Sequence, residues 1–207
     1  MPLSKTDINV ILVDENDNQI GTMEKIEAHE KGLLHRAFSV MFVRYDKNNN
    51  LEVLLQKRAS EKYHCGGLWS NTCCSHPLEN ESVLDAAKRR LPEELGLSQE
   101  LLENIELKSI GSFIYKAKLD NELTEHEYDH VIISMIPEDS QINFTDSSEI
   151  QVSLNKDEIS EIKWINLKNI YKNLQEKPLD YTPWLKSVLM CISPIITKPC
   201  VNNQRNA

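Results

Sequence analysis

SVLDAAKRRLPEELG, residues 82–96, is the first strong helical pattern in the chain, and segments typical of β-strands lie on both sides of it. Its apolar residues recur at helical spacing, namely Val83, Leu84, Ala87, Leu91 and Leu95. Ser82 is suited to the N-cap position, and Gly96 to the position just after the helix. Pro92 lacks a backbone N–H, so the pattern predicts a kink or a tightened last turn there.

The order of the remaining segments predicts the fold class. Apolar runs bounded by turn residues predict strands at residues 8–13, 19–23, 36–45, 51–56, 108–117, 128–136 and 161–165. Further helical patterns follow at residues 167–174 and 183–190. Strands, one helix, more strands and then helices indicate an α+β sandwich with a mixed central sheet. We expect a single domain, residues 1–207, with a loosely held polar tail after about residue 194.

Composition narrows the possible partners and location. The 207-residue chain is 40% hydrophobic and 27% charged, as is ordinary for a globular domain, and its formal charge is −9. This acidic balance, without a basic block, argues against a nucleic-acid partner. There is no signal-peptide pattern and no apolar run of membrane-spanning length, so we expect no membrane association. Five cysteines, an odd number, favour reduced thiols and a cytoplasmic location over a disulfide framework.

The segment EHEYDH, residues 125–130, carries candidate metal ligands. In an extended strand Glu125 and Glu127 project from the same face, so both carboxylates could bind one divalent cation. Taken alone, the pattern also fits the solvated face of an exposed hairpin.

Three histidines could complete a mixed nitrogen and oxygen site. His29 and His35 flank a connection that can turn at Gly32, and His76 ends the segment CCSH. With the two carboxylates they would suit Mn²⁺ or Mg²⁺, or Zn²⁺ in an unusual shell. The alternative is a structural zinc site formed by His64, Cys65, Cys73, Cys74 and His76. The lack of a C-x-x-C pair argues against that alternative.

Residues 75–97 resemble the Nudix box, G-x₅-E-x₇-R-E-U-x-E-E-x-G-U, with two departures. Ser75 replaces the opening Gly, and Arg90 replaces the Glu that follows the Arg. Nudix hydrolases generally hold divalent metal on the carboxylates of this helix. A guanidinium in place of a carboxylate is suited instead to bind phosphate through paired hydrogen bonds. The resemblance implies a Nudix-type α/β/α sandwich, whereas Arg90 disfavours hydrolysis.

Several motifs in order resemble the type I isopentenyl diphosphate isomerases, Nudix members that isomerise instead of hydrolysing. They extend from about residue 19 to residue 189 and comprise EAH (27–29), LHRAFS (34–39), WSNTCCSHP (69–77), residues 89–96, EHE (125–127) and TPW (182–184). The resemblance implies conversion of isopentenyl diphosphate into dimethylallyl diphosphate. Such a reaction adds a proton at one carbon and removes one from another, and positioned acid–base groups typically contribute about 10²–10⁴-fold.

The resemblance also implies roles for individual residues. Glu127, aided by Tyr115, would protonate the alkene, and Cys74 would remove the C2 proton. The first metal would be held by His29, His35, His76, Glu125 and Glu127. A second Mg²⁺, arriving with the diphosphate, would use Glu94 and the backbone carbonyl of Cys74.

Four cations would bind the diphosphate, namely Lys25, Arg58, Lys62 and Arg90. Trp184 would face the hydrocarbon tail and could stabilise a cation there by about 2 kcal/mol, although core packing would explain this residue equally well. Arg58 and Lys62 could likewise be ordinary surface charges. Two other functions stay open, a Nudix hydrolase acting on a diphosphate and a non-catalytic binding protein with the same fold. We expect a small-molecule diphosphate as the partner, and a monomer or weak dimer.

Overall fold

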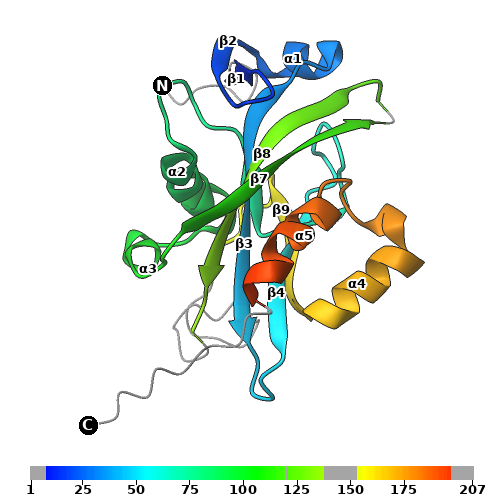
Figure 1. Ribbon diagram of the computed structural model, residues 1–207. Coiled ribbons are helices and arrows are strands. Elements are labelled where there is room, and N and C mark those ends of the chain that lie inside the picture. Colours follow the sequence, from blue (N-terminus) through cyan, green and yellow to red (C-terminus); the bar gives the residue numbers. More distant parts are fainter. Residues whose placement is uncertain (1–7, 120, 138–152, 197–207) are drawn as a thin grey trace.

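The computed structural model describes residues 8–119, 121–137 and 153–196. These residues form a nine-stranded sheet with helices on both faces (Figure 1). The strands are β1 (Asn9–Val13), β2 (Gln19–Glu24), β3 (His35–Tyr45), β4 (Leu51–Arg58), β5 (Trp69–Ser70), β6 (Cys73–Ser75), β7 (Lys108–Lys118), β8 (Thr124–Met135) and β9 (Ile159–Asn166). The helices are α1 (Lys25–Lys31), α2 (Val83–Leu95), α3 (Gln99–Glu103), α4 (Leu167–Glu176), the 3₁₀ turn η1 (Pro178–Asp180) and α5 (Leu185–Ile196).

Strand β3 organises the sheet. One of its edges runs parallel to β8, and its other edge pairs antiparallel with β1, β6 and β4 in turn. Strand β7 pairs antiparallel with β8, and β9 with β4. The sheet therefore contains both kinds of pairing, and the predicted mixed sheet is confirmed.

The two faces of β3 bury different residues because side chains alternate along a strand. Phe38, Val40 and Phe42 belong to a core that also contains Leu91 of α2. Met41 and its neighbours on the opposite face belong to a second core with the apolar side of α5. Helix α2 lies on one side of the sheet and α4 and α5 on the other (Figure 1). This arrangement confirms the predicted α/β/α sandwich.

Helix α2 follows the sequence prediction closely. The Ser82 side chain accepts a hydrogen bond from the Asp85 backbone N–H at 3.1 Å, as an N-cap does. The helix continues through Pro92 to Leu95, and the Gly96 N–H closes its last turn on the Pro92 carbonyl at 2.9 Å. Gly96 has a left-handed backbone (φ 68°), and a Cβ there would lie 2.2 Å from the Ser153 carbonyl oxygen. Glycine is therefore required at this position.

Several parts of the fold differ from the sequence prediction, among them strands β5 and β6, which were not predicted and are only two and three residues long. Helices α1 and α3 were not predicted because each is too short, at seven and five residues, to show an apolar period. Strand β8 begins at Thr124. The sequence prediction started it only at Tyr128, because the first residues of the strand are polar or charged and do not form an apolar run. Helix α5 includes Pro194 and ends at Ile196, so the predicted tail begins later, and the rest of it lies outside the described residues.

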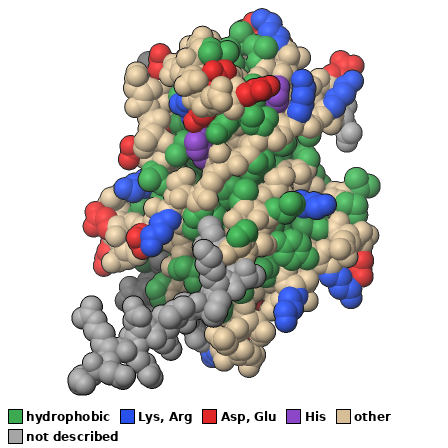
Figure 2. All heavy atoms as spheres, viewed as in Figure 1, with side chains coloured by type: hydrophobic (Ala, Val, Ile, Leu, Met, Phe, Trp, Pro, Cys, Tyr) green, Lys and Arg blue, Asp and Glu red, His purple; other side chains and the backbone are tan. Residues whose placement is uncertain are grey.

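The surface carries interspersed charges. On the face seen in Figure 2, Lys and Arg side chains are separated from one another by acidic and uncharged ones. Among the described helices, none combines the length and apolar character that crossing a membrane requires.

Candidate active site

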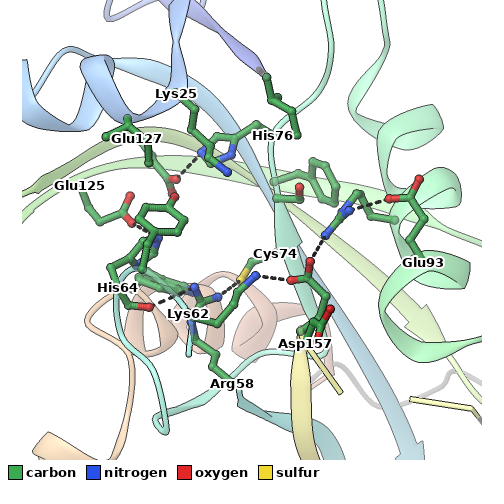
Figure 3. Close-up of a pocket in the computed structure, with 18 of the residues that line it drawn as sticks. Lys25, Arg58, Lys62, His64, Cys74, His76, Glu93, Glu125, Glu127 and Asp157 are labelled. Carbon is green, nitrogen blue, oxygen red and sulfur yellow. Dashed lines mark hydrogen bonds and ion pairs between the residues drawn. The ribbon is translucent and has the colours of Figure 1, made fainter. Parts of the chain in front are cut away.

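A cavity of about 760 Å³ lies among β3, β6, β8 and α2 (Figure 3). Ten of the predicted site residues line it, namely Lys25, Arg58, Lys62, Cys74, His76, Arg90, Tyr115, Glu125, Glu127 and Trp184. In Figure 3, Cys74 lies between the side of Glu125 and Glu127 and the side of Glu93. We call these two sides the imidazole end (His29, His35, His76, Glu125 and Glu127) and the cationic end (Lys62, Arg90, Glu93, Glu94 and Glu158).

Strand register brings the central residues together. His35 on β3 is opposite Glu127 on β8, and Tyr115 on β7 is opposite the same Glu127 from the other side. Cys74 on β6 is opposite Ser39 on β3. Residues distant in sequence therefore meet because β3, β7 and β8 are aligned at Glu127, and β6 pairs with β3 four residues further along, at Ser39.

The two carboxylates of the imidazole end are buried. Glu125 is 1% exposed and Glu127 8% exposed, so the interpretation as a solvated hairpin face is wrong. Burying a carboxylate is costly unless it is paired with hydrogen-bond donors or a metal. The placement therefore requires charge compensation within the cavity.

Two imidazoles are oriented by backbone carbonyls. His29 Nδ1 lies 2.6 Å from the Lys25 carbonyl oxygen, and His35 Nδ1 lies 2.8 Å from that of Leu33. A carbonyl only accepts, so each Nδ1 carries a proton and each Nε2 is turned toward the carboxylates, that of His29 toward Glu125 and that of His35 toward Glu127. Protein metal sites commonly fix a histidine ligand in this way.

The donor atoms converge as a metal site would require. His29, His35, His76 and Glu127 each contribute one donor atom to a group whose members lie within 4.8 Å of one another. The Nε2 atoms of His29 and His35 and Oε2 of Glu125 are buried without a hydrogen-bond partner among the described residues. Such a set fits a divalent cation. The candidate groups found in the described residues contain no cysteine, so the structural zinc alternative is not supported.

The carboxylates at this end influence one another. Burial and the neighbouring charge of Glu127 raise the pKa of Glu125. Burial also opposes ionisation of Glu127, but the neighbouring imidazoles of His35 and His76 hold its pKa well below the usual range. Glu127 Oε1 lies 3.0 Å from His76 Nε2, and the Tyr115 hydroxyl donates to Glu127 Oε2 at 2.7 Å.

Cys74 is a protonated thiol in this environment. Burial raises the pKa of the thiol to about 12, and the Arg58 guanidinium opposes that rise. Arg58 Nη1 lies 3.6 Å from Cys74 Sγ, and the Ser70 hydroxyl lies 4.0 Å from it. Among the described residues, Cys65, Cys73 and Cys191 are outside any disulfide, whereas Cys200 lies outside the described residues.

At the cationic end, opposite charges are already paired. Lys62 Nζ forms an ion pair with Glu158 Oε2. Arg90 contacts Glu93 at 2.5 Å, Glu94 at 2.7 Å and Glu158 at 3.6 Å. Glu94 is 3% exposed and belongs to neither candidate metal-ligand group of the described residues.

Trp184 both packs in the core and lines the cavity. It is 3% exposed, and its indole N–H donates to Asn71 Oδ1 at 3.0 Å. Its ring centroid lies 6.1 Å from that of Tyr115, and the Arg58 guanidinium carbon lies 5.7 Å from the Trp184 ring. The packing and cavity interpretations of this residue are therefore compatible.

Sequence reasoning gave no cavity role to three residues that line it, namely Tyr63, His64 and Glu158. Tyr63 stacks beneath Lys25, whose Nζ lies 4.9 Å from the ring centroid. His64 was considered only as a zinc ligand. Tyr63 and His64 directly follow the predicted cation Lys62, which was the one available signal, and Glu158 had none.

Comparisons with known proteins agree with the fold. The NUDIX domain family model matches residues 33–185. A Deinococcus radiodurans protein, DR0079, superimposes with a TM-score of 0.63 at 14% identity, covering 88% of this chain and 98% of that one. The NUDIX domain of Shewanella oneidensis NrtR, complexed with ADP ribose, gives a TM-score of 0.54 at 14% identity, covering 84% and 100%. At this identity the two structures show the fold alone.

Sequence relatives are much more similar. The isopentenyl-diphosphate Delta-isomerase of Aliivibrio fischeri (strain MJ11) is 46% identical over 179 residues, 86% of this chain and 91% of that protein. The isopentenyl-diphosphate Delta-isomerase 2 of Photorhabdus laumondii is 44% identical over 184 residues, 89% and 92% of the two chains.

Fold and site together define the class, a NUDIX-domain protein with a buried histidine and glutamate centre. Within that class, the chain belongs to the isopentenyl-diphosphate Delta-isomerase family, and the family resemblance seen in the sequence is confirmed. The protein is therefore an enzyme.

Proposed function

We propose that this enzyme converts isopentenyl diphosphate into dimethylallyl diphosphate, the precursors of isoprenoids. The observation that carries the proposal is the pairing of Cys74 with the Glu127–Tyr115 hydrogen bond on one cavity. Moving a double bond needs one proton donor and one proton acceptor beside the same substrate. A cavity that shelters both groups also excludes the water that would quench a carbocation-like species.

The acid–base pair, Cys74 and Glu127, must hold one transferable proton, so that one group can donate a proton while the other accepts one. In the substrate-free site the Cys74 thiol holds that proton, because burial raises its pKa to about 12. Glu127 rests as the carboxylate, since burial is outweighed by the neighbouring imidazoles of His35 and His76, which hold its pKa low. Glu127 as the acid and Cys74 as the base therefore requires a proton to reach Glu127 first. The Cys74 thiol proton is the one that must move, and its transfer leaves the thiolate that acts as the base, while the Tyr115 hydroxyl orients Glu127 by donating to its Oε2.

The imidazole end would hold a divalent cation, Mn²⁺ or Mg²⁺, or Zn²⁺ in an unusual shell. Three imidazole nitrogens and two carboxylates form the donor set, a mixture that these ions accept. A cation bound there supplies positive charge beside Glu127. A second Mg²⁺ on Glu94 would share that carboxylate with Arg90, which donates to Glu94 Oε1.

The remaining cations would bind the diphosphate. Lys25, Arg58, Lys62 and Arg90 line the cavity, and guanidinium groups bind phosphate oxygens through paired hydrogen bonds. Trp184 would face the hydrocarbon tail, since its ring lies near both Tyr115 and Arg58. Arg90 also neutralises carboxylates that a hydrolase would need for metal. We propose a single cytoplasmic domain that acts as a monomer or weak dimer.

The test is incubation with isopentenyl diphosphate and Mg²⁺, followed by NMR. We expect signals of dimethylallyl diphosphate and no phosphate release. Release of phosphate instead would support a diphosphate hydrolase. A folded, metal-loaded protein that gives neither product would support the non-catalytic alternative and contradict the proposal.

A further inference from the structure

His64 projects into the cavity from a tight turn between β4 and β5. The following residue, Cys65, has a left-handed backbone (φ 49°), which is uncommon outside glycine. A Cβ on Gly66 would lie 2.4 Å from the Ser60 carbonyl oxygen, so the turn is closely packed. His64 is consequently held inward and is 9% exposed.

The imidazole of His64 contacts one oxygen of Glu125. Its Nε2 lies 3.1 Å from Glu125 Oε1. The other oxygen, Oε2, lies 3.4 Å from His29 Nε2 and has no hydrogen-bond partner among the described residues. The two oxygens of the Glu125 carboxylate thus have different neighbours: Oε1 faces His64, and Oε2 faces His29 and the other candidate metal ligands.

Distances separate His64 from the ligands themselves. Donor atoms on one octahedral ion with bonds of about 2.1 Å lie at most about 4.2 Å apart. His64 forms a close group with His29 and Glu125, and neither His64 nor Glu125 belongs to the group of His29, His35, His76 and Glu127, so His64 reaches the converging donors only through its contacts with His29 and Glu125. His64 therefore lies at the margin of the candidate metal centre.

Neighbouring rings fix the orientation of His64. Its ring stacks on His29 with centroids 5.9 Å apart at 28°. The Tyr63 ring meets it edge-on at 4.2 Å, and the Trp184 ring at 6.1 Å. The imidazole can therefore present the same nitrogen to Glu125 without a large loss of side-chain entropy on metal binding.

We propose that His64 is a positioning residue of the metal centre, donating from Nε2 to Glu125 Oε1 and so directing Oε2 toward the cation. This inference rests on the proposed metal centre and adds a fourth imidazole that acts through Glu125. Outer-shell partners of metal ligands typically change metal affinity by about 10–100-fold when they are removed. His64 is expected to act on this scale.

The test measures Mn²⁺ binding to the full chain without substrate, by electron paramagnetic resonance titration. His64→Leu keeps the volume and removes the donor, and we expect about 10–100-fold weaker binding. His64→Gln retains an N–H of similar reach and is expected to restore most of the affinity. His130→Leu is the matched control, because His130 pairs with Asp17 and does not line the cavity. Circular dichroism and melting temperature check the fold of each variant.

Nuclear modulation in the same Mn²⁺ spectra counts the bound imidazoles. We expect three in both the wild type and His64→Gln. Four imidazoles in the wild type, or a His64→Leu affinity equal to that of the control, would overturn the proposal, as would a wild type that binds no Mn²⁺. Because no substrate is present, these outcomes are separate from the product assay, which can fail while the effect of His64 on Mn²⁺ remains.

Discussion

The imidazole end and the cationic end of the cavity hold their charges differently. At the imidazole end, His29 Nε2, His35 Nε2 and Glu125 Oε2 are buried without hydrogen-bond partners among the described residues. At the cationic end, Lys62 and Arg90 already contact Glu158. The first end is arranged to receive a cation with little rearrangement. The second must exchange a carboxylate for the diphosphate, so anion binding there is a competition.

Cys74 lies between the two ends and depends on both. Arg58 contacts its thiol from the cationic side, while the opposing acid–base group, Glu127, belongs to the imidazole end. This difference implies three separate effects of mutation. Loss of the acid–base pair should lower the rate of the isomerisation, and loss of the imidazole end should weaken cation binding. Loss of a paired carboxylate at the cationic end should strengthen anion binding.

The largest effect is expected at the acid–base pair. Cys74→Ala and Glu127→Gln should each lower the isomerisation rate by about 10²–10⁴-fold or more, because each removes a positioned proton-transfer group. The rate of dimethylallyl diphosphate formation, followed by NMR, measures this. Cys191→Ala is the matched control, since Cys191 is a free thiol on α5 that does not line the cavity. Equal rates for Cys74→Ala and the control would remove Cys74 from the mechanism.

The next effect is expected on removing metal. A cation that binds only the folded protein stabilises it by about 2.7 kcal/mol at 100 times its dissociation constant, which is about 100-fold in the unfolding equilibrium. Chelation should therefore lower the melting temperature and abolish turnover, and added Mn²⁺ or Mg²⁺ should restore both. A melting temperature that does not respond to any divalent cation would contradict the assignment of the imidazole end.

A smaller effect of opposite sign is expected at the cationic end. Glu158→Gln removes the charge that competes for Lys62 and Arg90, so inorganic pyrophosphate should inhibit about tenfold more strongly, in line with about 1.5 kcal/mol for a hydrogen bond to a charged group. Inhibition constants from the NMR assay measure the change. Glu161→Gln, an exposed position on β9 three residues further along the chain, is the control. Weaker inhibition in Glu158→Gln would show that Glu158 orients the cations instead of competing for them.

The sequence predicted the sandwich through local patterns of apolar and capping residues. It predicted most residues of the cavity through short motifs and the family resemblance that they carry. The apolar period of α2, its Ser82 cap and the alternation along β8 each act within a few residues. Electrostatic pairing is different. Nothing in the local sequence places Glu158 beside Lys62, or His64 beside Glu125, since these contacts join segments 96 and 61 residues apart. Burial of Glu125 and Glu127 was likewise hidden, because it arises from β3 and β7 flanking β8.

The smallest expected effect concerns the influence of Arg58 on the Cys74 thiol, which lies between the two ends. The rate of alkylation of Cys74 by iodoacetamide in metal-free protein measures it. Only the thiolate reacts, and burial raises the pKa of the thiol to about 12. Below that pKa the alkylation rate should rise about tenfold for each pH unit. Arg58→Leu removes the cation that opposes the rise, so the thiolate fraction falls and alkylation should be severalfold slower at any given pH. Arg58→Lys keeps a positive charge and should react at nearly the wild-type rate. Faster alkylation in Arg58→Leu would mean that Arg58 shields Cys74 from the reagent more than it stabilises the thiolate, and the two ends would then be coupled by packing instead of charge.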